Sequence, residues 1–361
     1  MRKIECDSKC KYQPKHQHLS QIRIWERTKE AIAKQRSIPM VSLLCLAILL
    51  LGCSAPTPTQ ATEDSAVEKL SQTGLYSDIK QNKLAEGVMP FTPQFKLWTD
   101  GATKKRWIYL PPGSKINSQD MDMWNFPVGT KLWKEFVRDG KRIETRLLHK
   151  IKDGVGMQGW VMAAYIWNES QTDAIISLAG ANNQKGTEHD VPSAAACTEC
   201  HGGRESVSLG FSAIQLSHSK EGLQLPKLIE QKQLSHPPKG IFKVPGTEED
   251  KFVLGYFHAN CSSCHNSENK NLFSNPLQEN KMSLLLKTSS LKSLAETELY
   301  KTAVKQGNQR GPITPGDANK SRLFQFMGGN NAEREMPPMG TELKDQQAMQ
   351  RIQSWINQLK P

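Results

Sequence analysis

Short apolar and alternating runs fill the middle of the chain, and they have the length and period of β-strands. The predicted strands are 104–110, 130–137, 141–151 and 159–167. Between the second and third runs stand Asp139 and Gly140, a dipeptide typical of a two-residue hairpin turn. This part of the chain therefore predicts a β-rich, sandwich-like domain.

Helical patterns replace the strand patterns in the last third of the chain. Thr247 and Asp250 have the spacing of a capping box, which predicts a helix running on to Asn260. Asp317 can cap a further helix through Met327, and apolar residues at helical spacing predict an amphipathic helix over 344–359. The fold class predicted is α+β and multidomain, with an all-α domain after the β-rich one.

The N-terminal segment has the pattern of an export signal. Lys34 and Arg36 precede an apolar run, 41–51, that is too short for the ~20 residues of a membrane span. The run ends at Gly52 and Cys53, which resembles a bacterial lipoprotein signal; that resemblance implies that Cys53 becomes a lipidated N-terminus. Ser54, directly after Cys53, resembles the residue at that position in lipoproteins sorted to the outer membrane. We expect a periplasmic, lipid-anchored protein.

These patterns divide the chain into four parts. We assign 1–52 to the leader, 53–85 to a tether, 86–246 to the β-rich domain and 247–361 to the helical domain. The composition of the 361 residues, 37% hydrophobic and 23% charged, excludes collagen-like and wholly disordered chains. Of the net charge of +11, more than half lies in the leader, so nucleic acid is not an expected partner.

The cysteines are the residues that indicate a cofactor. After the leader and Cys53, only four of the eight cysteines remain, and each pair is followed by histidine. The two motifs are Cys197, Cys200, His201 and Cys261, Cys264, His265. C-x-x-C-H is the attachment pattern of c-type haem: two thiols form thioethers with the vinyl groups, and the histidine binds the iron. A disulfide, a zinc site or a thioredoxin-type motif is the alternative, but export and the repeated full pattern argue for two covalently attached haem c groups.

The surroundings of the second motif resemble class I cytochrome c over residues 247–361. In that family a helix leads into C-x-x-C-H, the last helix crosses it, and a methionine in a proline-containing loop is the sixth ligand. The resemblance implies Met336, which precedes Pro337 and Pro338, as that ligand, with Met339 as the other candidate. It also implies that the carbonyl of Pro276 orients His265.

Tryptophans and carboxylates are frequent around the predicted strands. The tryptophans are Trp98, Trp107, Trp124, Trp133, Trp160 and Trp167. They could stack on a sugar or quinone, but a β-domain core is the commoner role. Among the carboxylates, Asp100, Glu144 and Glu169 cannot be paired into an acid–base couple from sequence.

Several stretches, taken with the two motifs, resemble an uncharacterised family of exported dihaem c-type cytochromes. The stretches are Phe95–Ile108, Phe126–Thr130, Ile143–Arg146, Tyr165–Glu169 and Leu209–Ser212. Some members of that family are encoded with, or fused to, a parallel β-helix protein, which the resemblance implies as a partner. The resemblance covers about residues 85–361 and implies periplasmic electron transfer.

We therefore expect electron transfer between a periplasmic dehydrogenase and a further acceptor, with redox proteins as partners. The first alternative is a dihaem enzyme such as a peroxidase, with an open position on the first haem; the second is a carbohydrate- or partner-binding β-module. The sixth ligand of the first haem is open among His149, His189, His218, His236, His258, Met157 and Met162.

Overall fold

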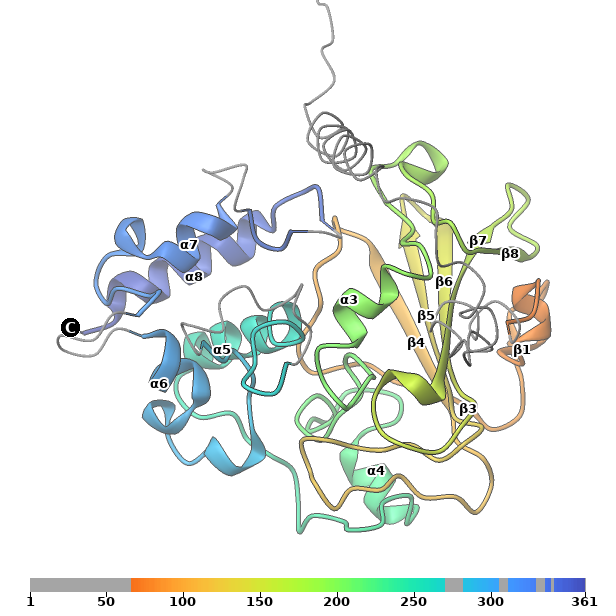
Figure 1. The fold of residues 1–361 in the computed structure, drawn as a ribbon, viewed down its shortest axis with the longest axis horizontal. Helices are drawn as coiled ribbons and strands as arrows, with labels where there is room; N and C mark the ends of the chain where they lie inside the picture. Colours follow the sequence, from red (N-terminus) through yellow and green to blue (C-terminus); the bar gives the residue numbers. More distant parts are fainter. Residues whose placement is uncertain (1–65, 270–281, 305–310, 329–334, 339–340, 361) are drawn as a thin grey trace, which may run out of the picture. The chain divides into compact units, whose positions relative to one another are not determined.

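The computed structural model describes residues 66–269, 282–304, 311–328, 335–338 and 341–360 (Figure 1). The leader and Cys53 lie outside the described residues, as do Pro276 and Met339, so the predictions made for them stay predictions. Among the described residues, no helix is both long enough and apolar enough to cross a membrane.

The largest element is a six-stranded antiparallel sheet in which each strand pairs with the next along the chain. Its strands are β3 (Val88–Pro90), β4 (Thr103–Tyr109), β5 (Lys131–Arg138), β6 (Lys141–Lys150), β7 (Trp160–Trp167) and β8 (Ala174–Ser177). Asp139 and Gly140, between β5 and β6, both have positive φ, 49° and 76°, as a primed hairpin turn requires. The predicted strands and hairpin are confirmed.

One face of this sheet buries tryptophans from β4, β5 and β7. Trp107, Trp133 and Trp167 pack there with Leu70 and Leu75, which come from the segment before the sheet. Both leucines have no exposed surface, and burying such a side chain stabilises the fold by about 1.5–3 kcal/mol. The assignment of 66–85 to a tether is therefore wrong, because these leucines attach the segment to the sheet.

The same segment contains a small second sheet. It pairs β1 (Tyr76–Asp78) with β2 (Lys83–Leu84) and is preceded by a 3₁₀ turn, η1 (Leu70–Gln72). The β-rich character is confirmed, but the described strands form one open six-stranded sheet and this hairpin, not two facing sheets of similar size. Five of the six tryptophans are buried core residues; Trp98 is only partly buried.

The opposite face of the sheet, which we call the motif face, packs on the irregular chain that follows β8. Ile108, Leu132, Leu148 and Met162 form its apolar part, and Cys197 packs against the same cluster. The helices α3 (Cys197–His201) and α4 (Leu225–Glu230) belong to this irregular part, as does η3 (Gln184–Gly186), whereas η2 (Met157–Gly159) directly precedes β7. In Figure 1, α3 lies between the sheet and α5.

Helices dominate after residue 247. They are α5 (Glu248–Asn260), α6 (Glu298–Ala303), α7 (Arg322–Met327) and α8 (Gln346–Gln358), with the 3₁₀ turns η5 (Thr288–Ser290), η6 (Leu294–Glu296) and η7 (Ala318–Lys320). Thr247 and Asp250 form the predicted capping box at the start of α5. Asp317 caps η7 only, and α7 begins after the extended residue Ser321, so the helix predicted there is interrupted.

The first and last of these helices pack together. The Trp355 indole N–H donates to Asp250 Oδ1 at 2.8 Å, and Arg351 forms an ion pair with Glu249. Val253, Phe257 and Ile356 belong to a core cluster of this helical part. The α+β class is thereby confirmed.

Candidate haem site

The first C-x-x-C-H motif forms a helix of its own. α3 begins at Cys197 and ends at His201, so Cys197 and Cys200 are three residues apart and lie on one side of the helix. Both thiols are free, and burial raises the pKa of each above the ordinary thiol value. Two neutral thiols on one helical face are placed for thioether formation.

The ring of His201 is held in one tautomer. Its Nδ1 lies 2.7 Å from the carbonyl oxygen of Val207, and since a carbonyl only accepts, Nδ1 must carry the proton. Nε2 then has a free lone pair. Burial lowers the pKa of His201 to about 4, so the ring is neutral at pH 7. This is the arrangement of a metal-binding histidine with its orienting partner; no sequence signal pointed to Val207.

The second motif continues from the end of α5. The Cys261 N–H donates to Phe257 O, and the His265 N–H donates to Cys261 O at 2.8 Å, so the motif is a tight turn attached to the helix. Burial, with Cys264 nearby, raises the pKa of Cys261 to about 12. Burial also lowers the pKa of His265, which favours the neutral imidazole needed for ligation.

The chain directly after the first motif contacts the second motif. A Cβ atom added to Gly203, two residues after His201, would lie 1.9 Å from the carbonyl oxygen of Ser263, so only glycine fits there. The buried amide of Asn266 joins the two backbones, since its Nδ2 donates to Gly203 O at 3.3 Å and to Ser263 O at 3.2 Å. The structure thus brings all six predicted cysteine and histidine ligands into one neighbourhood.

A segment before β4 connects the β-rich part to the second motif. We call Phe95–Asp100 the strap. The Trp98 N–H donates to Asn260 Oδ1 at 2.7 Å, and Asn260 Nδ2 donates to Lys96 O at 3.1 Å. The Phe95 ring lies so close to Gly255 that a Cβ there would be 2.0 Å from it. The strap therefore lies along α5 and holds the residue that precedes Cys261.

The strap also binds the chain that follows Met336. Asp100 Oδ1 accepts the backbone N–H groups of Glu342 at 2.8 Å and Leu343 at 2.7 Å, while the Trp98 indole donates to Leu343 O at 2.7 Å. Asp100 is 3% exposed and has a φ of 46°. The carboxylate that sequence could not pair thus anchors the loop 341–343.

Met336 itself is half-buried. Its N–H donates to Phe326 O at 3.1 Å, which attaches the loop to α7. Among the described residues, Met336 is not one of the residues of the helical core cluster. Its ligation of the second haem stays a prediction.

Three of the histidines considered for the first haem have other roles. His149 is on the sheet face opposite the motif face, beside Lys131. His218 uses both ring nitrogens, one toward Thr92 O and one toward the Lys220 N–H. His236 is exposed and bonds the hydroxyl of Ser235.

The remaining histidines are buried. His258 Nδ1 accepts the Leu286 N–H at 3.2 Å, so its ring proton is on Nε2, and burial lowers its pKa to about 3. His189 has no exposed surface, and its Nε2 lies 2.7 Å from Glu144. Met162 is a core residue of the motif face, whereas Met157 is only partly buried, and a Cβ on Gly202 would lie 3.7 Å from its Cγ. Met157 is thus the candidate that lies beside the first motif.

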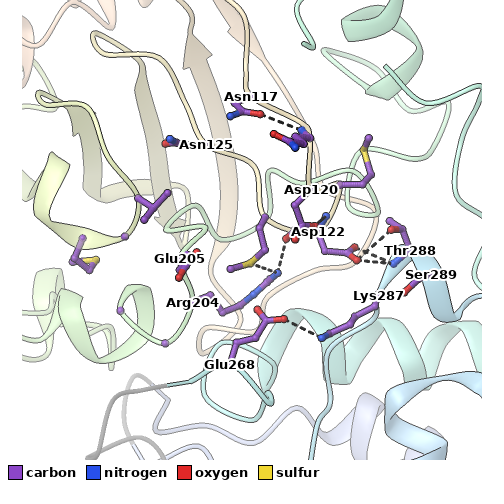
Figure 2. A pocket seen from close by; sticks show the side chains of 18 residues that line it. Asn117, Asp120, Asp122, Asn125, Arg204, Glu205, Glu268, Lys287, Thr288 and Ser289 are labelled. Carbon is purple, nitrogen blue, oxygen red and sulfur yellow. Dashed lines mark hydrogen bonds and ion pairs between the residues drawn. The ribbon is translucent and has the colours of Figure 1, made fainter. Parts of the chain in front are cut away.

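A pocket of about 980 Å³ lies where the residues after His201 meet loops from both parts of the chain. Figure 2 shows Arg204 directed at Asp122, and Glu268 paired with Lys287 at 2.9 Å. The Arg204 Nη2 donates to Asp122 O at 2.7 Å, and the Asp122 carboxylate accepts the Thr288 N–H at 2.9 Å. Sequence analysis did not find this pocket, because its polar residues come from separate loops.

Comparisons with known proteins add no relative. No protein-family model, no curated protein and no solved structure is significantly similar to this chain. The geometry of the two motifs is therefore the basis on which a function is assigned.

Proposed function

We propose that the chain is an exported dihaem c-type cytochrome that transfers electrons between a periplasmic dehydrogenase and a further acceptor. The observation that carries this proposal is that Gly203, two residues after the first C-x-x-C-H motif, lies against Ser263 inside the second and is joined to it by Asn266. Two covalent haems would supply one-electron redox chemistry. Attachment points held this close together along the chain's contacts suit a relay, because they would place the two redox groups near each other.

The residues present fit the two groups. None of the four motif cysteines is in a disulfide, and His201 has one ring nitrogen oriented by Val207 and the other available. Because desolvation disfavours the protonated ring, both motif histidines are neutral ligands at pH 7. A zinc site would need four converging ligands, and the described residues contain no cluster of three or more His, Cys, Asp or Glu side chains placed for a metal ion.

Within this proposal the helical part is a class I cytochrome c domain. Support comes from α5 leading directly into Cys261, from the packing of α8 on α5, and from a Met336 loop fixed at both ends. Thioether ligation at Met336 favours ferrous iron and so raises the reduction potential, which suits accepting electrons from a dehydrogenase.

Location and partners complete the proposal. The lipid on Cys53 would hold the protein at the periplasmic side of a bacterial membrane, in keeping with outer-membrane sorting. Its partners would be periplasmic redox proteins, and the family resemblance adds a parallel β-helix protein. The formation of haem c needs export, with which the signal pattern agrees.

The test counts haems. We expect the mature chain, produced with the haem c attachment machinery, to exceed its polypeptide mass by two haem groups. Changing Cys197 and Cys200 to Ala should remove one haem, and changing Cys261 and Cys264 to Ala should remove the other. Ser263→Ala is the matched control: it lies inside the second motif and should keep both.

Spectra of the same preparations separate the alternatives. Two low-spin haems support an electron carrier, whereas a high-spin haem with peroxide turnover would support the dihaem enzyme. A preparation with one haem that is indifferent to the Cys197 and Cys200 changes would overturn the dihaem proposal.

A further inference from the structure

A row of cations crosses the motif face. Arg106 on β4 is paired in register with Lys134 on β5, which is paired with Arg146 on β6. We call these three residues the cationic row. One step along the strands, Lys104 faces Phe136. Like charges directly opposite one another destabilise a sheet, so this arrangement needs a compensating anion.

The described residues supply only part of that compensation. Glu144 is fully buried and pairs with Arg146 at 2.9 Å, but it also binds His189. Lys134 rests over the Phe136 ring at 5.5 Å and forms no ion pair in the described part of the chain. One shared carboxylate therefore faces several cations.

Arg106 lacks a partner altogether among the described residues. It is 8% exposed, and its Nε is buried without a hydrogen bond. A buried guanidinium left unpaired is costly, because its charge and its donors are removed from water without replacement. Burial correspondingly lowers the pKa of Arg106 to about 10, and burial followed by Arg106 and Arg146 lowers that of Lys134.

The first C-x-x-C-H motif lies over this face. Cys197 packs against the apolar cluster that contains Leu132 and Leu148, the neighbours of the row on β5 and β6. Lys134 is two residues from Leu132 on β5, and Arg146 is two residues from Leu148 on β6, so both cations point to the face against which Cys197 packs. A group attached to the two thiols of this motif therefore lies between α3 and the cationic row.

We infer that the cationic row binds the two propionate carboxylates of the haem attached at Cys197 and Cys200. This inference rests on the proposed function. A haem bound through its vinyl edge still has two carboxylates, and guanidinium and ammonium groups are the donors that bind carboxylates most strongly. The row also favours the ferrous state, because reduction removes one positive charge from its vicinity. It thereby raises the reduction potential of this haem.

The experiment changes single row residues in the holoprotein. Arg106→Gln and Lys134→Gln should keep both covalent haems by mass, lower the potential of one haem in a redox titration, and leave the other unchanged. Lys105→Gln is the matched control: it removes one positive charge from β4, the strand of Arg106, but on the opposite face, where the Lys105 side chain is 70% exposed. Lys134→Arg should restore the potential, since it keeps the charge.

The outcomes separate the two proposals. A wild-type protein that carries fewer than two covalent haems by mass would refute the dihaem function. Two haems whose potentials respond to the row variants no more than to Lys105→Gln would overturn the propionate assignment alone. Resonance Raman spectra of the wild-type protein give a check that needs no variant: the propionate bending band of one haem should lie at the raised frequency of a hydrogen-bonded carboxylate, and two bands at the free frequency would also overturn it.

Discussion

Replacing Asp100 tests whether the strap holds the loop that carries Met336. Asp100→Gly removes the carboxylate that accepts the Glu342 and Leu343 N–H groups, while glycine adopts the φ of 46° without strain. Asp100→Asn is the matched control. Its amide oxygen can accept the same two bonds, and asparagine tolerates a positive φ.

The size of the effect follows from the two hydrogen bonds. A bond to a charged group contributes about 1.5–3 kcal/mol, and we take the lower end because Glu342 and Leu343 are exposed enough for water to replace the carboxylate. The glycine variant should therefore lose about 3 kcal/mol in the docking of the loop. Since each 1.4 kcal/mol is tenfold, the docked population falls relative to the undocked one by roughly a hundredfold.

The docking of the loop can be measured through the ligation of iron by Met336. If Met336 binds the second haem, the oxidised protein should show a weak sulfur–iron charge-transfer band in the far red, and Met336→Ala should abolish it. Asp100→Gly should weaken the band and lower the melting temperature, while Asp100→Asn keeps both near wild type. Equal bands and equal melting temperatures in the Gly and Asn variants would show that Asp100 does not hold the loop.

Two further predictions concern stability. Gly203→Ala should lower the free energy of unfolding by about 1–3 kcal/mol, because the new Cβ would overpack against Ser263 O. Gly240→Ala is the control, since no atom lies within 4 Å of its new Cβ, and it should leave thermal unfolding unchanged. Equal losses in the two variants would refute the contact between Gly203 and Ser263. Glu144→Gln should cost about 3 kcal/mol by leaving Arg146 unpaired, with the exposed Glu169→Gln as control. Burial opposes ionisation of Glu144, but Arg146 and His189 hold its pKa below the ordinary 4.5. The stability of the wild-type protein should therefore fall as the pH drops below about 4.5. Denaturant titrations over a pH series should show a shallower fall for the Glu144→Gln protein.

Local patterns explain what sequence predicted well. β4 to β7, the Asp139–Gly140 turn, α5 and α8 each have a period or cap that is contained within the segment itself. The strands β3 and β8 are three and four residues long and lie at the sheet edges, so they have too few positions to show a period. The sequence of 66–85 does not indicate its attachment to the sheet, because its apolar residues, among them Leu70 and Leu75, are spread among polar ones without a helix or strand period.

Long-range partners explain what sequence missed. Asp100 binds backbone groups 242 and 243 residues away, and backbone N–H groups leave no trace in a side-chain pattern. Gly203 shows its role only beside Ser263, and the cationic row appears only once the register of β4, β5 and β6 is known. The two C-x-x-C-H motifs can be recognised in the sequence because the attachment pattern of haem c is contiguous.

Several contacts between the β-rich and helical parts occur beside the candidate ligands. The strap binds Asn260, which precedes Cys261, and the loop that follows Met336. Gly203, two residues after His201, lies against Ser263 inside the second motif. A class I cytochrome domain acting alone would need none of these contacts. Within the proposed function, the β-rich part therefore fixes the ligand-bearing segments of the helical part, so a substitution in the strap or on the motif face should alter the redox behaviour of a haem as well as stability.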